Sequence, residues 1–173
     1  MVTMLLSSVV SGVITIALFL WLRWCPVSLD YIKTKPLRVL LWVAVIALAA
    51  LVPSVWLEEL IPEQYTQNVY EDFFELVMRD KLGYVIVGLV APLVEEIVFR
   101  GAILRVLLNW SSQWQNKRET MTWAMISLSA IMFALVHANP AQMPHAFLMG
   151  LLLGWLYYRT GSIIPGVIFH WVN

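Results

Sequence analysis

Glu95 and Glu96 are adjacent carboxylates inside an apolar run, and Arg100 follows them within one helical turn. The stretch from Leu82 to Leu108 is otherwise almost uncharged, and it is long enough to span a bilayer. A charged side chain near the bilayer centre costs about 2.5–3.5 kcal/mol on insertion scales, so such groups normally face a partner or a water-filled cavity. The cluster therefore predicts a functional site inside the membrane.

The spacing of these three residues predicts two different roles for the glutamates. On an α-helix, Glu96 and Arg100 share a face at i, i+4, with the acid nearer the amino end, which is the favourable order for an ion pair. Glu95 is turned away from Arg100 on the same helix. We therefore expect Arg100 to hold Glu96 and Glu95 to keep a free carboxylate for proton chemistry. The alternative is a Glu–Arg pair that only locks helices together, and it leaves the second glutamate unexplained.

Two of the three histidines lie in other apolar segments, where they invite chemistry. His137 closes one such segment, and His170 lies in another, with Asn173 on the same helical face. Two carboxylates and two imidazoles in a dry bundle can activate a water, either on a divalent metal or by general-base catalysis alone. The H-E-x-x-H motif is absent, which excludes a standard zincin. The third histidine, His145, is expected in a loop and is given no role.

Composition places the chain in the membrane. Hydrophobic residues make up 61% and charged residues 13% of the 173 residues, with a mean hydropathy of +0.78. Soluble domains are usually about 45–50% apolar and about 25% charged. A net charge of zero gives no electrostatic basis for nucleic-acid binding. A single cysteine, Cys25, excludes an intrachain disulfide and a multi-cysteine metal site.

The hydropathy pattern predicts an all-α fold, a polytopic transmembrane helical bundle of about six spans forming one membrane domain over residues 1–173. Pro53 is expected to kink or end the second span. The last helix is too short for about 30 Å of hydrocarbon, so we expect it to continue past residue 173. Basic residues in alternate connections favour an outside amino terminus. The expected spans are 1–22, 37–57, 82–108, 121–137, 146–158 and one that begins near 165.

One long polar segment, from Glu58 to Asp80, interrupts these spans. Its mixture of acidic, aromatic and aliphatic residues predicts an amphipathic helix on the outer face. Residues 1–80 would then provide two anchoring spans and this acidic segment, and residues 81–173 would form the catalytic core.

Three motifs, in this order and on separate predicted helices, resemble the CPBP family, the CAAX-protease and bacteriocin-processing (Abi) membrane proteins. The family pattern is E-E-x-x-x-R, then F-x-x-x-H, then H-x-x-x-N. This chain matches it with Glu95, Glu96 and Arg100, with Phe133 and His137, and with His170. The family asparagine would fall one residue beyond Asn173, so we expect either that Asn173 replaces it or that it follows the last residue. The resemblance covers about residues 83–173.

The resemblance implies intramembrane hydrolysis of a peptide bond, with a prenylated (CAAX-type) or leader-peptide substrate. It implies that Glu95 activates water with the help of Glu96, that His137 binds or activates that water, and that His170 stabilises the oxyanion with an asparagine. Arg100, Phe133 and Asn173 would be supporting residues. If one divalent metal such as zinc is bound, its ligands would be Glu95, His137 and His170; a metal-free mechanism is the alternative.

The implied partners are the lipid bilayer and a membrane-embedded or lipid-linked peptide. The protein itself is expected to be a multi-pass protein of a bacterial or archaeal plasma membrane. Two other functions compete with the protease. One is a catalytically idle relative that acts as an immunity or scaffold protein. The other is a proton-coupled carrier, since buried carboxyl–histidine chains also serve proton relays. Carriers usually contain internal repeats, and the sequence shows none.

Overall fold

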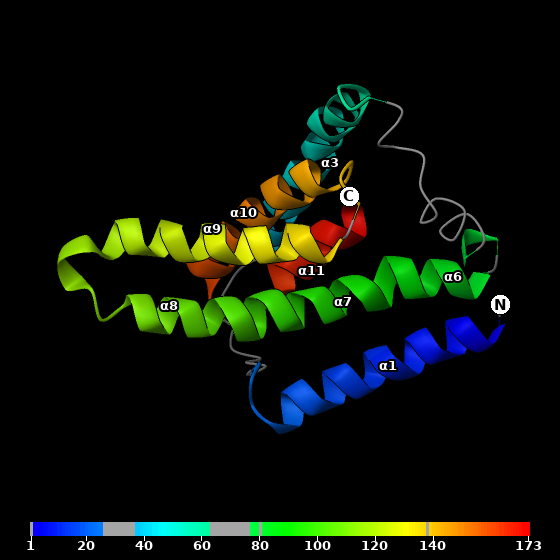
Figure 1. Cartoon of the computed structure of the whole chain (residues 1–173), viewed down its shortest axis with the longest axis horizontal. Coiled ribbons are helices and arrows are strands. Elements are labelled where there is room, and N and C mark those ends of the chain that lie inside the picture. The colour runs from blue at the N-terminus through cyan, green and yellow to red at the C-terminus, as the bar shows by residue number, and fades with distance from the viewer. Residues whose placement is uncertain (1, 26–36, 63–76, 80, 138) are drawn as a thin grey trace.

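The computed structural model describes residues 2–25, 37–62, 77–79, 81–137 and 139–173, and the regular structure in these ranges is helical (Figure 1). Most of the predicted amphipathic segment, residues 63–76 and 80, lies outside the described residues. Its first two glutamates instead belong to the end of a preceding helix. The helices are α1 (Val2–Trp21), α3 (Leu37–Glu59), a long composite helix (Lys81–Ser111), the short 3-10 turn η3 (Gln115–Lys117), α9 (Arg118–Val136), α10 (Met143–Thr160) and α11 (Ile164–Val172).

Three of the described helices are long and apolar enough to cross a membrane, namely Val39–Leu57, Lys81–Ser111 and Arg118–Val136. Leu6–Trp21 is a shorter apolar helix. The all-helical membrane fold is thus confirmed, whereas six full spans are not found among the described helices. Helix α10 is not among these three; it packs against α3, α9 and α11.

The composite helix continues through a proline because its backbone widens into π-helix. It consists of α6 (Lys81–Val85), η1 (Ile86–Val90), α7 (Ala91–Glu95), η2 (Glu96–Leu104) and α8 (Arg105–Ser111), with η1 and η2 in π conformation. Pro92 is the second residue of α7, which follows η1; it lacks an N–H and its ring would clash with the carbonyl of Gly88 in a regular α-helix. Local π adjustment is a known way for membrane helices to accommodate proline.

Of the two effects expected of Pro53, a kink or an end of the span, the end is not found, because α3 runs through Pro53 to Glu59. Proline removes one backbone hydrogen bond at this level. The hydroxyl of Ser54 donates to the carbonyl of Ala50 at 2.6 Å.

Small residues bring α9 and α10 close together. A side chain on Gly150 would lie 2.8 Å from the Cα of Ala130, so only a glycine fits at this crossing. Close contact of this kind lets van der Waals packing hold helices together in lipid, where the hydrophobic effect between helices is weak.

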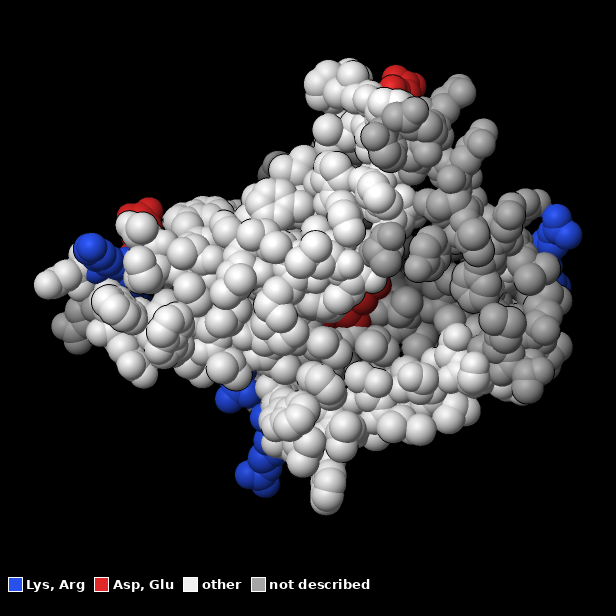
Figure 2. Space-filling model, in the orientation of Figure 1, with Lys and Arg blue, Asp and Glu red and all other residues white. Residues whose placement is uncertain are grey.

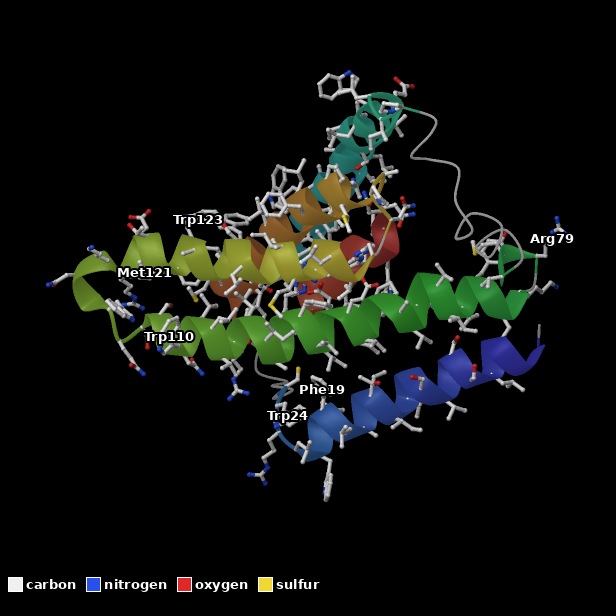
Figure 3. All side chains as sticks on the ribbon, viewed as in Figure 1. Phe19, Trp24, Arg79, Trp110, Met121 and Trp123 are labelled. Atoms are coloured by element: carbon white, nitrogen blue, oxygen red, sulfur yellow. The ribbon has the colours of Figure 1, made fainter. Side chains whose placement is uncertain are left out.

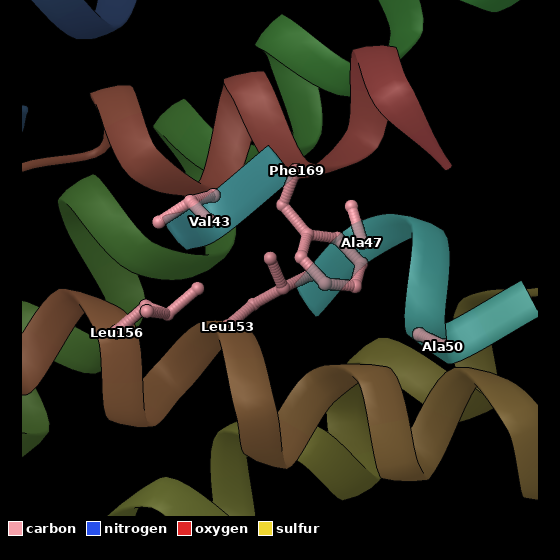
Figure 4. Packing of buried hydrophobic residues seen from close by; sticks show 6 residues of the cluster. All are labelled: Val43, Ala47, Ala50, Leu153, Leu156 and Phe169. Atoms are coloured by element: carbon pink, nitrogen blue, oxygen red, sulfur yellow. The ribbon is translucent and has the colours of Figure 1, made fainter. Parts of the chain in front are cut away.

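The carboxyl-terminal helices enclose an apolar core beside the motifs. Val43, Ala47 and Ala50 of α3 pack against Leu153 and Leu156 of α10 and Phe169 of α11 (Figure 4). Phe169 directly precedes His170 in the chain. This packing therefore fixes the position of α11, the helix that carries the histidine of the third motif.

The outer surface of the bundle is largely apolar and uncharged on the face shown in Figure 2. Two exposed tryptophans, Trp110 of α8 and Trp123 of α9, lie near the connection between these helices (Figure 3). Trp24, after α1, stacks edge to face on Phe19 with ring centroids 5.1 Å apart. Exposed tryptophans at helix ends suit the bilayer interface, where an amphipathic ring is stabilised.

Candidate active site

A cavity of about 540 Å³ brings together residues that are far apart in the sequence. Figure 2 shows acidic atoms at the bottom of a hollow in an otherwise uncharged region of the surface. The helices α3, α7, α9, α10 and α11 and the segment η1 contribute to its wall. The polar residues that matter most for chemistry are Glu95, His137, Asn139, His170 and Asn173, and Phe133 is their aromatic neighbour.

Glu96 and Arg100 form the ion pair that their spacing predicts. Nη1 of Arg100 lies 3.0 Å from Oε1 of Glu96, and each side chain is only 1% exposed. A buried ion pair needs close geometry to offset the loss of hydration of both groups. Glu96 is therefore held behind the cavity wall and is not one of the residues that line it.

Arg100 also stacks on Phe133, the aromatic residue of the second motif. Its Cζ atom lies 4.3 Å from the centroid of the Phe133 ring, within the range of a cation–π interaction. The same ring makes edge-to-face contacts with Phe99 at 5.1 Å and with His137 at 4.8 Å. Phe133 thus fixes the positions of the guanidinium and of one histidine at once.

Glu95 has the free position that was expected. Its side chain is 32% exposed and lines the cavity. Nε2 of His170 lies 3.9 Å from Oε2 of Glu95 and 3.4 Å from Oε1 of Glu96. His170 is therefore placed between the free carboxylate and the one that Arg100 holds, which connects the third motif to the first.

His137 is oriented by its own helix. Its Nδ1 lies 2.7 Å from the carbonyl oxygen of Phe133, which accepts a hydrogen bond from the ring N–H. In the neutral ring, this bond leaves Nε2 as the acceptor nitrogen. His137 therefore offers a lone pair for a water or another donor. Its ring lies next to Phe133, whose centroid is 6.3 Å from that of His170, so both histidines approach the same turn of α9.

The structure also shows what Asn173 binds. Its Nδ2 donates to the carbonyl of Ala47 on α3 at 2.9 Å. The residue lines the cavity, but its amide donor is used to connect the end of α11 to α3.

A metal fits the described residues poorly. Within the described ranges, no group of three or more His, Cys, Asp or Glu side chains is placed to hold a metal ion. The expected ligands Glu95, His137 and His170 share the cavity without forming such a group.

Three residues near the site were missed or misplaced from the sequence. His145 lies in the first turn of α10 and not in a loop, because α10 begins at Met143 with Pro144 at a first-turn position that favours proline. His145 also lines the cavity. Asn139 lines it too, and no role is predicted for this residue from the sequence. Gly166 was not recognised at all.

Gly166 of α11 faces the Glu96 carboxylate so closely that no side chain fits between them. A Cβ at this position would lie 2.6 Å from Cδ of Glu96 and would clash with Oε2. We expect Gly166→Ala to displace Glu96 from Arg100 and His170. Overpacking of this kind typically destabilises a protein by about 1–3 kcal/mol, and a displacement of about 1 Å in a site lowers activity by about 10²-fold.

Thermal melting and peptide cleavage check this prediction. The matched control is Gly88→Ala on the composite helix, where an added Cβ meets no atom within 4 Å and where the melting temperature should not fall. A Gly166→Ala protein with wild-type melting and cleavage would show that Glu96 has room to move.

Comparison with known proteins gives the chain a family. Residues 78–173 match the model of the type II CAAX prenyl endopeptidase Rce1-like family. No match was found among curated proteins or among solved structures. The matched range is more than half of the chain and includes Glu95, Glu96, His137 and His170. The chain therefore belongs to the Rce1-like type II CAAX prenyl endopeptidase family of membrane proteases, as its three motifs predicted.

Proposed function

We propose that the protein is an intramembrane endopeptidase in which Glu95 activates the attacking water. Family membership implies a protease that acts on peptides. The observation that carries the mechanism is the contrast between two adjacent carboxylates. Glu96 is buried against Arg100, while Glu95 faces a cavity that also contains His137 and His170.

In the first step, a water held between Glu95 and Nε2 of His137 attacks the carbonyl carbon of the substrate. The new C–O bond forms as the water proton passes to the Glu95 carboxylate. The carbonyl π electrons move to its oxygen, which becomes an oxyanion. A positioned general base typically contributes 10²–10⁴-fold to the rate, and the Nδ1–H···O bond to Phe133 keeps His137 in the orientation that accepts from water.

In the second step, the tetrahedral intermediate collapses and the C–N bond breaks. Glu95 returns its proton to the leaving nitrogen, so the products are a carboxylic acid and an amine and the enzyme regains its starting state; the acid then gives its proton to the amine or to water. In its protonated form His170 carries an Nε2–H that stabilises the oxyanion. One well-placed donor of this kind is worth about 2.7–4 kcal/mol.

This mechanism routes no step through a metal, because the described donor residues do not form a metal-binding group. Arg100 supplies fixed positive charge, and Glu95 with the two histidines moves and holds the protons. Sensitivity of cleavage to a chelator, reversed by added zinc, would instead assign the water to a metal.

The experiment is cleavage of two fluorogenic peptides of the same sequence, one prenylated at a carboxyl-terminal cysteine and one not. The protein is reconstituted in vesicles, and the reaction is run in ¹⁸O-labelled water. We expect cleavage of the prenylated peptide with one ¹⁸O atom in the new carboxylate. Preferred cleavage of the unprenylated peptide would shift the substrate class to leader peptides. Absence of cleavage of either peptide, and of a wider peptide library, would contradict the proposed activity.

A further inference from the structure

Two asparagines line the cavity, and their side-chain amides are used differently. The Nδ2 of Asn173 donates to the Ala47 carbonyl on α3. Asn139 makes its side-chain hydrogen bond through the other end of the amide, since its Oδ1 accepts from the backbone N–H of Ala141 at 3.0 Å. The NH₂ group of Asn139 therefore remains as a donor.

Among the described residues, this donor has no hydrogen-bond partner. Asn139 as a whole is only 3% exposed. Its Nδ2 is not among the fully buried side-chain atoms that lack a partner, so it keeps access to the cavity that Asn139 lines. Buried polar groups are nearly always paired, and an unpaired one in a native structure calls for an explanation. A bound peptide in the cavity would supply the missing acceptor.

The orientation of the amide is fixed before any substrate arrives. A backbone N–H can only donate, so the amide atom that faces the N–H of Ala141 is the oxygen Oδ1. The nitrogen Nδ2 therefore points away from the turn. The carbonyl of Asn139 also accepts from the backbone N–H groups of Gln142 and Met143 at 3.0 Å each, which anchors the residue to the start of α10. Asn139 follows His137 by two residues, so the turn joins the donor to the histidine that faces the same cavity.

We propose that Asn139 is a catalytic residue whose Nδ2–H donates to the carbonyl oxygen of the scissile peptide. This inference rests on the proposed peptidase function. The oxygen gains negative charge as the water adds to the carbon, so a preorganised donor binds it more strongly in the transition state than in the ground state. Asn139 then approaches the oxyanion from the connection between α9 and α10, and His170 approaches it from α11.

Two variants remove this donor and retain the turn. Asn139→Ser and Asn139→Asp both keep an oxygen that can accept from Ala141 N–H, but neither has the amide NH₂. We expect kcat to fall about 10²–10³-fold, as for loss of an oxyanion-hole donor, while KM and the melting temperature change little. Because the serine variant adds no charge, it separates loss of the donor from repulsion by a new carboxylate near Glu95.

The control is Asn109→Asp, the same chemical change at an exposed position on α8, which should leave kcat unchanged. The inference is overturned if Asn139→Ser retains wild-type kcat, even if Asn139→Asp is slow. It is also overturned if KM rises while kcat stays constant, because the donor would then only bind substrate. Glu95→Gln is measured in the same assay: if it cleaves at the wild-type rate, or if wild type does not cleave, the proposed function itself is wrong.

Discussion

Glu95→Gln is expected to lower kcat for peptide cleavage by about 10²-fold or more while the protein keeps its yield and its melting temperature. Glutamine preserves the size of the side chain and can hydrogen-bond to His170, which lies 3.9 Å from the Glu95 carboxylate. It cannot take a proton from water, so the contribution of the general base is lost. Folding should be little affected, because a neutral amide is less costly to place in a membrane than a carboxylate.

The matched control for this variant is Glu119→Gln, the same substitution at an exposed position in the first turn of α9. Both variants are purified, melted and assayed beside the wild type on the same peptide. Glu119→Gln should cleave normally. If a well-folded Glu95→Gln protein also cleaves normally, Glu95 is not the base. If it retains the cellular phenotype of the wild type although it does not cleave, the idle scaffold is the better description.

Arg100→Gln is expected to have a different effect, with loss of stability together with loss of activity. Removing one partner of a buried ion pair usually destabilises a protein by about 3–5 kcal/mol, because the other charge is left without compensation. Glu96 is 1% exposed, and its remaining close partner of opposite type among the described residues would be the His170 ring, 3.4 Å away. That contact would draw His170 away from Glu95, and Phe133 would lose the cation stacked on its ring.

Melting temperature and expression yield measure this effect, with Arg105→Gln as the control on the same helix. Arg105 is partly exposed and donates to the backbone carbonyls of Arg23 and Trp24 at 3.4 and 3.2 Å. Because these are not buried charge pairs, the control should lose about 1 kcal/mol or less. If the two variants have the same melting temperature, the Glu96–Arg100 pair contributes no more to the stability of the protein than a surface contact does.

The local part of the site could be predicted from the sequence because it depends on one helix. The Glu96–Arg100 pair needs only the i, i+4 spacing, and it forms even though η2 has π geometry. The approach of His137 and His170 to Glu95 was predictable on chemical grounds, because polar groups in a membrane gather around a partner or a cavity.

The parts that the sequence did not reveal depend on contacts between distant segments. The bond from Asn173 to Ala47 joins α11 to α3, and no local pattern indicates it. The fit of Gly166 against Glu96 depends on how α11 approaches η2. The described helices include three that are long and apolar enough to span a membrane, so the predicted count of six is not shown. Hydropathy alone does not give this count, because an apolar segment inside a bundle resembles one that faces lipid.

The position of Cys25 allows cysteine labelling experiments to be carried out on the natural sequence. This thiol is the one cysteine in the sequence; it is 2% exposed and lies against Gly101 of the composite helix. Burial raises the pKa of the Cys25 thiol, so little of the reactive thiolate forms at neutral pH. A single cysteine introduced at an exposed position can therefore be modified by a maleimide without first removing the native one. The orientation of each helix end in the membrane thus becomes measurable by reagent accessibility in a protein whose site is unaltered.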